Sequence, residues 1–152
     1  MTAGYSSRSL ADKLGIKPGT QVLVLSAPPA YPSLLGELPD GATLHTRAPT
    51  TSAFTHWFVR KRDDLDISFP RLARTLSDKG TLWVSWPKQA SGVKTDLNEN
   101  IIREVGLKEG LVDVKVIAVD EVWSGLKFVR RVQNRAGRVS RVKGLGSDVQ
   151  PE

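Results

Sequence analysis

The run TQVLVLSA, residues 20–27, constrains the fold of this chain more than any other stretch. It is apolar at nearly every position and is bounded by Pro18-Gly19 and Pro28-Pro29. A strand that is apolar on both faces is typical of a parallel sheet covered by helices on both sides, whereas a half-exposed strand alternates. We therefore predict an α/β fold in which residues 20–27 form the central strand.

The rest of the chain alternates strand-like and helix-like stretches. We expect helices within 31–38, 62–80 and 95–110, with a kink or a break at Pro70, and strands over 20–27, 42–47, 51–60, 80–86, 111–119 and 125–132. The connection between the last two strands is short, so this pair should be antiparallel. The order predicts a Rossmann-like, mostly parallel sheet of about six strands that ends in an antiparallel C-terminal hairpin strand.

Basic residues are concentrated at the C-terminal end. Residues 130–152 hold six of the 22 Lys and Arg residues but only two of the 16 Asp and Glu residues. Gly and Ser are frequent there, and no apolar face could build a core. We predict a single domain over 17–134, an N-terminal extension over 1–16 and a disordered basic tail over 135–152. A solvated tail is the favoured interpretation, and the alternative is nonspecific nucleic-acid contact through Arg135, Arg138, Arg141 and Lys143.

Several classes of site have no support in the residues. The chain has no Cys and two His, so we expect no metal site, and it has no G-x-S-x-G nucleophile elbow. His56 alternates with Phe54 and Phe58 along a strand, and we interpret it as a packed histidine in preference to a ligand. No apolar run reaches the roughly 20 residues that span a bilayer, and no secretory signal is visible. We expect a cytoplasmic protein with no membrane partner and assign no catalytic residue.

The chain resembles two groups of known proteins. The segment GTLWVSWPKQASGVKTDLNENIIREVGLKEGLVDVKVIAVDEVWSGLKFVRR, residues 80–131, resembles a family of small bacterial proteins known as a domain of unknown function. That resemblance spans most of 17–132 and implies that this range is the whole domain. The order of elements resembles the sheet of the S-adenosylmethionine-dependent methyltransferases, which also ends in a hairpin that places a reversed strand inside the sheet.

The methyltransferase resemblance implies a cofactor turn after the first strand. In that superfamily the turn is acidic and rich in glycine, and a second acid after the next strand holds the ribose hydroxyls. Here LSAPPAYPSLLG, residues 25–36, has no glycine before Gly36 and no acid, and LHTRAPTTS, residues 44–52, has no acid. We therefore expect no cofactor, with S-adenosylmethionine disfavoured. The leading hypothesis is a noncatalytic binding protein, and the alternative is a divergent methyltransferase.

A candidate ligand site follows from the rule that open parallel sheets bind ligands at the carboxyl ends of their strands. The loops 26–31, 86–95 and 120–125 should meet at that edge, and a helix beginning near Thr95 or Asp96 could offer its amides to an anion. A capped loop with solvated lysines is an equally good interpretation. Trp123 is either an exposed aromatic platform or, as we favour, a plug packed over the sheet. Our candidates for binding a small anion or a protein partner are Ser26, Tyr31, Trp86, Lys88, Ser91, Lys94, Thr95 and Trp123.

Overall fold

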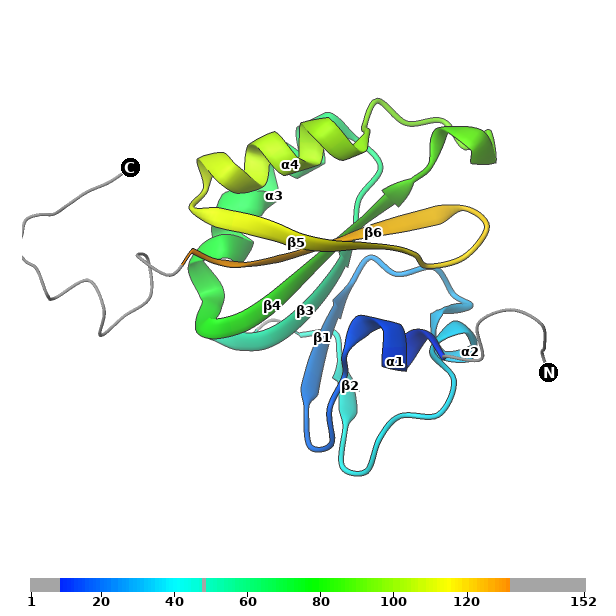
Figure 1. Ribbon diagram of the computed structural model, residues 1–152, viewed down its shortest axis with the longest axis vertical. Coiled ribbons are helices and arrows are strands. Elements are labelled where there is room, and N and C mark those ends of the chain that lie inside the picture. The colour runs from blue at the N-terminus through cyan, green and yellow to red at the C-terminus, as the bar shows by residue number, and fades with distance from the viewer. Residues whose placement is uncertain (1–8, 48, 132–152) are drawn as a thin grey trace, which may run out of the picture.

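The computed structural model describes residues 9–47 and 49–131, and Figure 1 shows one sheet with helices on both sides. The elements are α1 (Leu10–Leu14), β1 (Gln21–Leu25), α2 (Tyr31–Leu35), β2 (Thr43–His45), β3 (Ser52–Phe58), α3 (Arg62–Thr75), β4 (Leu76–Pro87), the 3₁₀ turn η1 (Gln89–Ser91), α4 (Glu99–Lys108), β5 (Leu111–Ala118) and β6 (Trp123–Arg130). The predicted tail 135–152, with Arg135, Arg138, Arg141 and Lys143, lies outside the described residues.

The sheet has the strand order β2-β1-β3-β4-β6-β5. β1 pairs in parallel with β2 and β3, and β3 pairs in parallel with β4. β6 is antiparallel to both of its neighbours, β4 and β5. This arrangement confirms the predicted α/β fold, with a mostly parallel sheet of six strands and a reversed hairpin strand inside it. After β1 the chain builds β2 on one side and later β3 on the other, so the topological switch point lies between β1 and β3.

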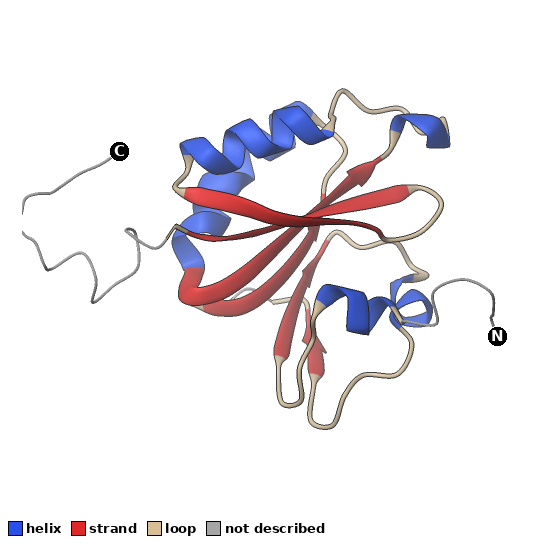
Figure 2. Cartoon of the chain, viewed as in Figure 1, coloured by secondary structure: helices blue, strands red, loops and turns tan. Residues whose placement is uncertain are grey.

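Each face of the sheet has its own apolar core. α1 and α2 cover one face, and α3 and α4 cover the other (Figure 2). On the first face the indole N–H of Trp83, which is fully buried, donates to the carbonyl of Leu14 at 3.0 Å. On the second face Phe69 of α3 and Phe128 of β6 pack edge to face with ring centroids 5.5 Å apart. Burial on both faces explains why the central strands are continuously apolar.

One helix was not predicted, and another differs from its prediction. α1 lies inside the segment predicted as an N-terminal extension, where Leu10 and Leu14 are buried and the Ser9 hydroxyl caps the helix by accepting from the Asp12 amide. α3 continues through Pro70 as one helix, and β4 begins at Leu76, directly after it. The early start of β4 has a tertiary cause, because Leu76 pairs with Ser52 of β3.

No helix in the described ranges is long and apolar enough to cross a bilayer.

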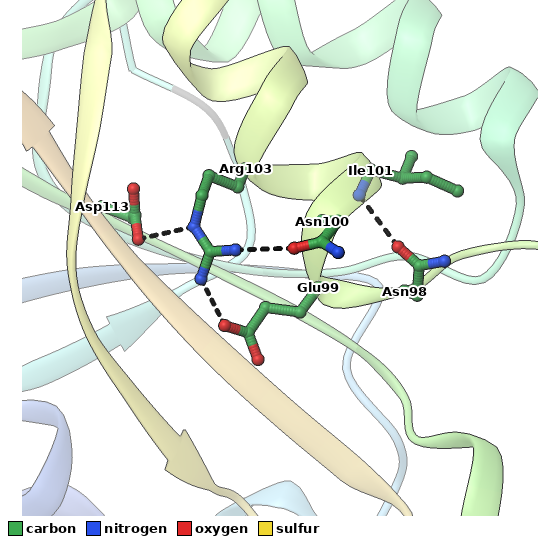
Figure 3. Close-up of polar contacts among 6 residues, drawn as sticks. All are labelled: Asn98, Glu99, Asn100, Ile101, Arg103 and Asp113. Carbon is green, nitrogen blue, oxygen red and sulfur yellow. Dashed lines mark hydrogen bonds and ion pairs between the residues drawn. The ribbon is translucent and has the colours of Figure 1, made fainter.

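The start of α4 also differs from the prediction. The helix begins at Glu99, and its cap is the Asn98 side chain, whose Oδ1 accepts from the Ile101 amide at 2.9 Å (Figure 3). Arg103 then ties the helix to β5, because its Nε donates to Asp113 Oδ2 at 2.9 Å. The same guanidinium pairs with Glu99 and donates to Asn100 Oδ1. Thr95 and Asp96, near which the sequence predicted the start of this helix, form hydrogen bonds elsewhere.

Candidate functional site

A cavity of about 370 Å³ opens at the switch point between the carboxyl ends of β1 and β3. We call it the switch-point pocket. β1 contributes the residue that follows it, β3 contributes its last residues and those that follow it, and α3 contributes its first two turns. The lining residues are Ser26, Trp57, Phe58, Val59, Arg60, Lys61, Asp64 and Ser68.

The turn after β1 takes a left-handed backbone conformation at a serine. Ser26 has a φ of 59°, in the region that glycine usually supplies, and its side chain is exposed at the pocket. This conformation costs a residue with a Cβ roughly 1–2 kcal/mol. The tight turn therefore exists here without the glycine that the sequence lacks. Strained residues of this kind persist where the surrounding structure imposes them, often at functional sites.

The pocket carries charges of both signs. Arg60 and Lys61 follow β3, and Asp64 lies in the first turn of α3, with all three side chains exposed. The Arg60 guanidinium carbon lies 5.0 Å from the centre of the Trp123 ring, a cation–π contact that orients this side chain. Trp123 itself is buried and packs edge to face on Phe58. The site thus presents two cations and one carboxylate together with the aromatic residues Trp57 and Phe58.

The loop between η1 and α4 clamps the rim of the pocket. The Thr95 hydroxyl donates to the Arg60 carbonyl at 2.6 Å, and Asp96 Oδ1 accepts from the Arg62 amide at 2.8 Å. Asp96 therefore caps α3 from a distance, which satisfies an amide that α3 cannot pair internally. These two bonds explain why α4 does not begin near Thr95 or Asp96, where the sequence predicted its start. The loop does reach the carboxyl edge of the sheet, but the Thr95 and Asp96 side chains form hydrogen bonds with backbone groups there.

The other predicted ligand residues do not line the pocket. Trp86 and Tyr31 are buried, and the buried position of Trp123 matches the interpretation of this side chain as a plug. The Ser91 hydroxyl donates to the Lys88 carbonyl at 2.7 Å, which closes the η1 turn. Lys94 is exposed in the loop that follows η1, and the Lys88 amide donates to the Val122 carbonyl at 2.8 Å. Of the predicted set, Ser26 lines the pocket, Thr95 touches its rim and Trp123 contacts the Arg60 side chain. Their role in binding stays a prediction.

A buried polar chain lies beneath the carboxyl edge. The Tyr31 hydroxyl is 2.7 Å from His56 Nδ1, and His56 Nε2 is 2.7 Å from Ser85 Oγ. Burial lowers the pKa of His56 to about 3 and raises the pKa of Tyr31 above its ordinary value. His56 is therefore neutral near pH 7 and links β3 to β4 and α2. In residues 9–47 and 49–131, no group of three or more His, Asp or Glu residues is arranged to hold a metal.

Most of the pocket was not predicted from the sequence. Trp57, Arg60, Lys61, Asp64 and Ser68 were not among the candidates, although they follow the carboxyl end of a predicted strand. The usable signal was the rule that ligands bind at the switch point. Applying this rule requires knowing that β2 and β3 pair with opposite edges of β1. No local pattern in the sequence gives that strand order.

No protein-family model and no curated protein matches the chain, so the resemblance to a domain-of-unknown-function family gains no support. Solved structures do match. The fibrillarin pre-rRNA processing protein of Methanococcus jannaschii has a TM-score of 0.54 at 12% identity, over 76% of this chain and 68% of that chain. Magnesium protoporphyrin IX methyltransferase from Synechocystis, with bound S-adenosylhomocysteine, has a TM-score of 0.53 at 13% identity, over 80% of this chain and 78% of that chain. A TehB-like S-adenosylmethionine-dependent methyltransferase from Corynebacterium glutamicum has a TM-score of 0.50 at 12% identity, over 80% of this chain and 85% of that chain.

These likenesses show a methyltransferase-like Rossmann fold, and they correct two expectations. Ranking a noncatalytic binding protein above a methyltransferase was wrong, because the structural neighbours include S-adenosylmethionine-dependent methyltransferases. The expectation of no cofactor was wrong as well, because the Synechocystis enzyme carries S-adenosylhomocysteine in one structure and S-adenosylmethionine in another. The physical source of both errors is the turn after β1. Its lack of glycine suggested a lost site, but Ser26 adopts the left-handed conformation and a pocket lies beside it.

Proposed function

We propose that this chain is a divergent S-adenosylmethionine-dependent methyltransferase that holds its cofactor in the switch-point pocket. The observation that carries the proposal is the coincidence of two features. The sheet has the reversed strand β6 between β4 and β5, and a pocket opens between the carboxyl ends of β1 and β3. In open α/β sheets, ligands bind at this switch point.

The residues of the pocket fit the chemistry of S-adenosylmethionine. Its volume falls within the range of roughly 300–1,000 Å³ typical of ligand pockets. Arg60 and Lys61 are suited to the carboxylate of the methionine part, and Asp64 is suited to its ammonium group. Ser26 and Ser68 offer hydroxyls to the ribose, a role that an acid after β2 would have in the superfamily. When bound, the cofactor supplies a methyl group on a sulfonium for transfer to an acceptor.

The chain fixes its pocket residues before any ligand arrives. Trp123 holds the Arg60 guanidinium from one side, while Thr95 holds the Arg60 carbonyl. Asp96 secures the start of α3, the helix that carries Asp64. Preorganisation of this kind reduces the entropy that binding must overcome.

Calorimetric titration with S-adenosylmethionine and S-adenosylhomocysteine tests the proposal. We expect saturable binding of both, and at 100 times the dissociation constant either ligand should stabilise the fold by about 2.7 kcal/mol. Asp64→Asn should weaken binding at least tenfold. The matched control is Asp63→Asn, which removes the same charge one residue away and does not line the pocket.

Two results would count against this function. If neither ligand binds at millimolar concentration, the cofactor assignment is wrong. If both bind but Asp64→Asn and Asp63→Asn weaken binding equally, the cofactor lies somewhere other than the switch-point pocket.

A further inference from the structure

Two lysines stand side by side on the sheet face that carries α1. Lys115 of β5 and Lys127 of β6 are direct cross-strand partners, and Lys127 is also opposite Trp83 of β4. Because partners in a sheet share a face, both lysines lie on the Trp83 side. We call the exposed and half-buried residues of this region the lysine face, which consists of Val112, Lys115, Ile117, Lys127 and Val129.

This arrangement lowers the stability of the fold. Like charges directly opposite each other on neighbouring strands repel. Neither Lys115 nor Lys127 forms an ion pair within residues 9–47 and 49–131. The nearby acid Asp113 is turned to the other face, where it binds Arg103 of α4. In a regular strand, residues 113 and 115 would lie on the same face. The bulge between them shifts the register by one residue, so Asp113 and Lys115 lie on opposite faces.

The helices that cover the sheet leave the pair accessible, since Lys115 is exposed and Lys127 is half-buried. The helix that packs on β5 and β6 is α4, which lies on the opposite face. The last turn of α1 lies beside the lysine face, since the Leu14 carbonyl accepts from Trp83, the strand neighbour of Lys127. Lys115 and Lys127 themselves therefore supply the positive charge of this face.

From this geometry we propose that the lysine face binds the phosphate backbone of single-stranded nucleic acid. Paired ammonium groups without acids between them complement a chain of phosphates. A flexible single strand can bring successive phosphates to side chains whose Cβ atoms are about 5 Å apart, whereas a duplex holds its phosphates at fixed spacing. The apolar groups of the face are Val112, Val129 and Ile117, and Trp83 is buried, so within the described ranges this face offers bases no aromatic platform to stack on. Binding should therefore show no sequence preference.

The charge of the face makes a quantitative prediction for salt dependence. On single strands, each neutralised phosphate contributes roughly 0.7 to the slope of log K against log salt concentration. The variant Lys115→Gln/Lys127→Gln should therefore flatten this slope by about 1.4. At 50 mM salt, binding should weaken on the order of tenfold for each lysine removed.

The measurement is fluorescence anisotropy of a labelled 20-nucleotide oligouridylate with the full chain, from 25 to 200 mM KCl. The matched control is Arg71→Gln/Lys108→Gln, which removes the same charge from exposed positions on α3 and α4 across the sheet. Both double variants are also made in a background with Arg135, Arg138, Arg141 and Lys143 changed to Gln, so that the tail cannot mask the face. Thermal unfolding of Lys115→Gln/Lys127→Gln should not shift to lower temperature, because the change removes a repulsion.

The possible outcomes differ for each explanation. A flatter slope for Lys115→Gln/Lys127→Gln, with little change in the control, supports the proposal. Equal changes in both variants would show that net charge alone is responsible, and the proposal would be overturned. It would equally be overturned if the oligonucleotide does not bind, or if the chain binds anionic phosphatidylserine vesicles in place of the oligonucleotide.

Discussion

Gly106 is the position where a single methyl group tests the packing of α4 on the sheet. It lies on the buried face of the helix, against Phe128 of β6. A Cβ at residue 106 would lie 2.1 Å from Phe128 Cε1 and 2.7 Å from Cζ, far inside van der Waals contact. Phe128 is fully buried and rests edge to face on Phe69, so its ring has little room to retreat.

Two opposing effects decide the sign of Gly106→Ala. In an exposed helix, replacing Gly by Ala stabilises by about 1 kcal/mol. Overpacking a filled core costs about 1–3 kcal/mol, and sometimes more. Because the ring would have to move by roughly 1 Å or more to reach an ordinary contact, we expect the upper part of that range. The net result should be a destabilisation of about 2 kcal/mol, or roughly 5–10 °C in Tm for a domain of this size.

Urea unfolding followed by tryptophan fluorescence measures this difference. Glu104→Ala, at an exposed position in the same helix, is the control and should change stability by less than about 0.5 kcal/mol. Adding Phe128→Leu to Gly106→Ala should cost less than the sum of the two single changes, since the smaller side chain relieves the clash. If Gly106→Ala is at least as stable as the wild type, α4 does not approach β6 as closely as the structure indicates.

Two further predictions follow from the pH response of a buried side chain and from a helix cap. Burial lowers the pKa of His56 to about 3 against about 6.5 in the unfolded chain, so its contribution to stability is complete above pH 6.5 and is lost as pH falls toward 3. Between pH 6.5 and 4, His56→Gln should reduce the decline of the free energy of unfolding by up to about 1.4 kcal/mol per pH unit, as measured by urea titration. An unchanged decline would show that His56 is not held neutral. Asn98→Ala should destabilise the fold by about 1 kcal/mol through loss of the α4 cap, whereas equal unfolding curves for variant and wild type would contradict the capping bond.

Local patterns determined the architecture. The apolar run 20–27 predicted a strand covered on both faces, and β1 forms there with helices on both sides of the sheet. Its expected central place was wrong, because β1 is the second strand from the edge. The short connection after residue 119 predicted an antiparallel pair, and β5 and β6 form it. Periodicity and loop length are properties of short segments. They could therefore be read without knowing which segments meet.

Contacts between distant segments decided the candidate site. The switch-point pocket exists because β3 pairs with β1, and Thr95 and Asp96 bind the backbone of Arg60 and Arg62, more than thirty residues upstream. Those bonds leave the start of α4 to Asn98. Lys115 likewise faces Lys127 only because a bulge shifts the register of β5. Strand order, register and the choice among competing caps depend on the energy of the assembled structure, which no short stretch of sequence contains.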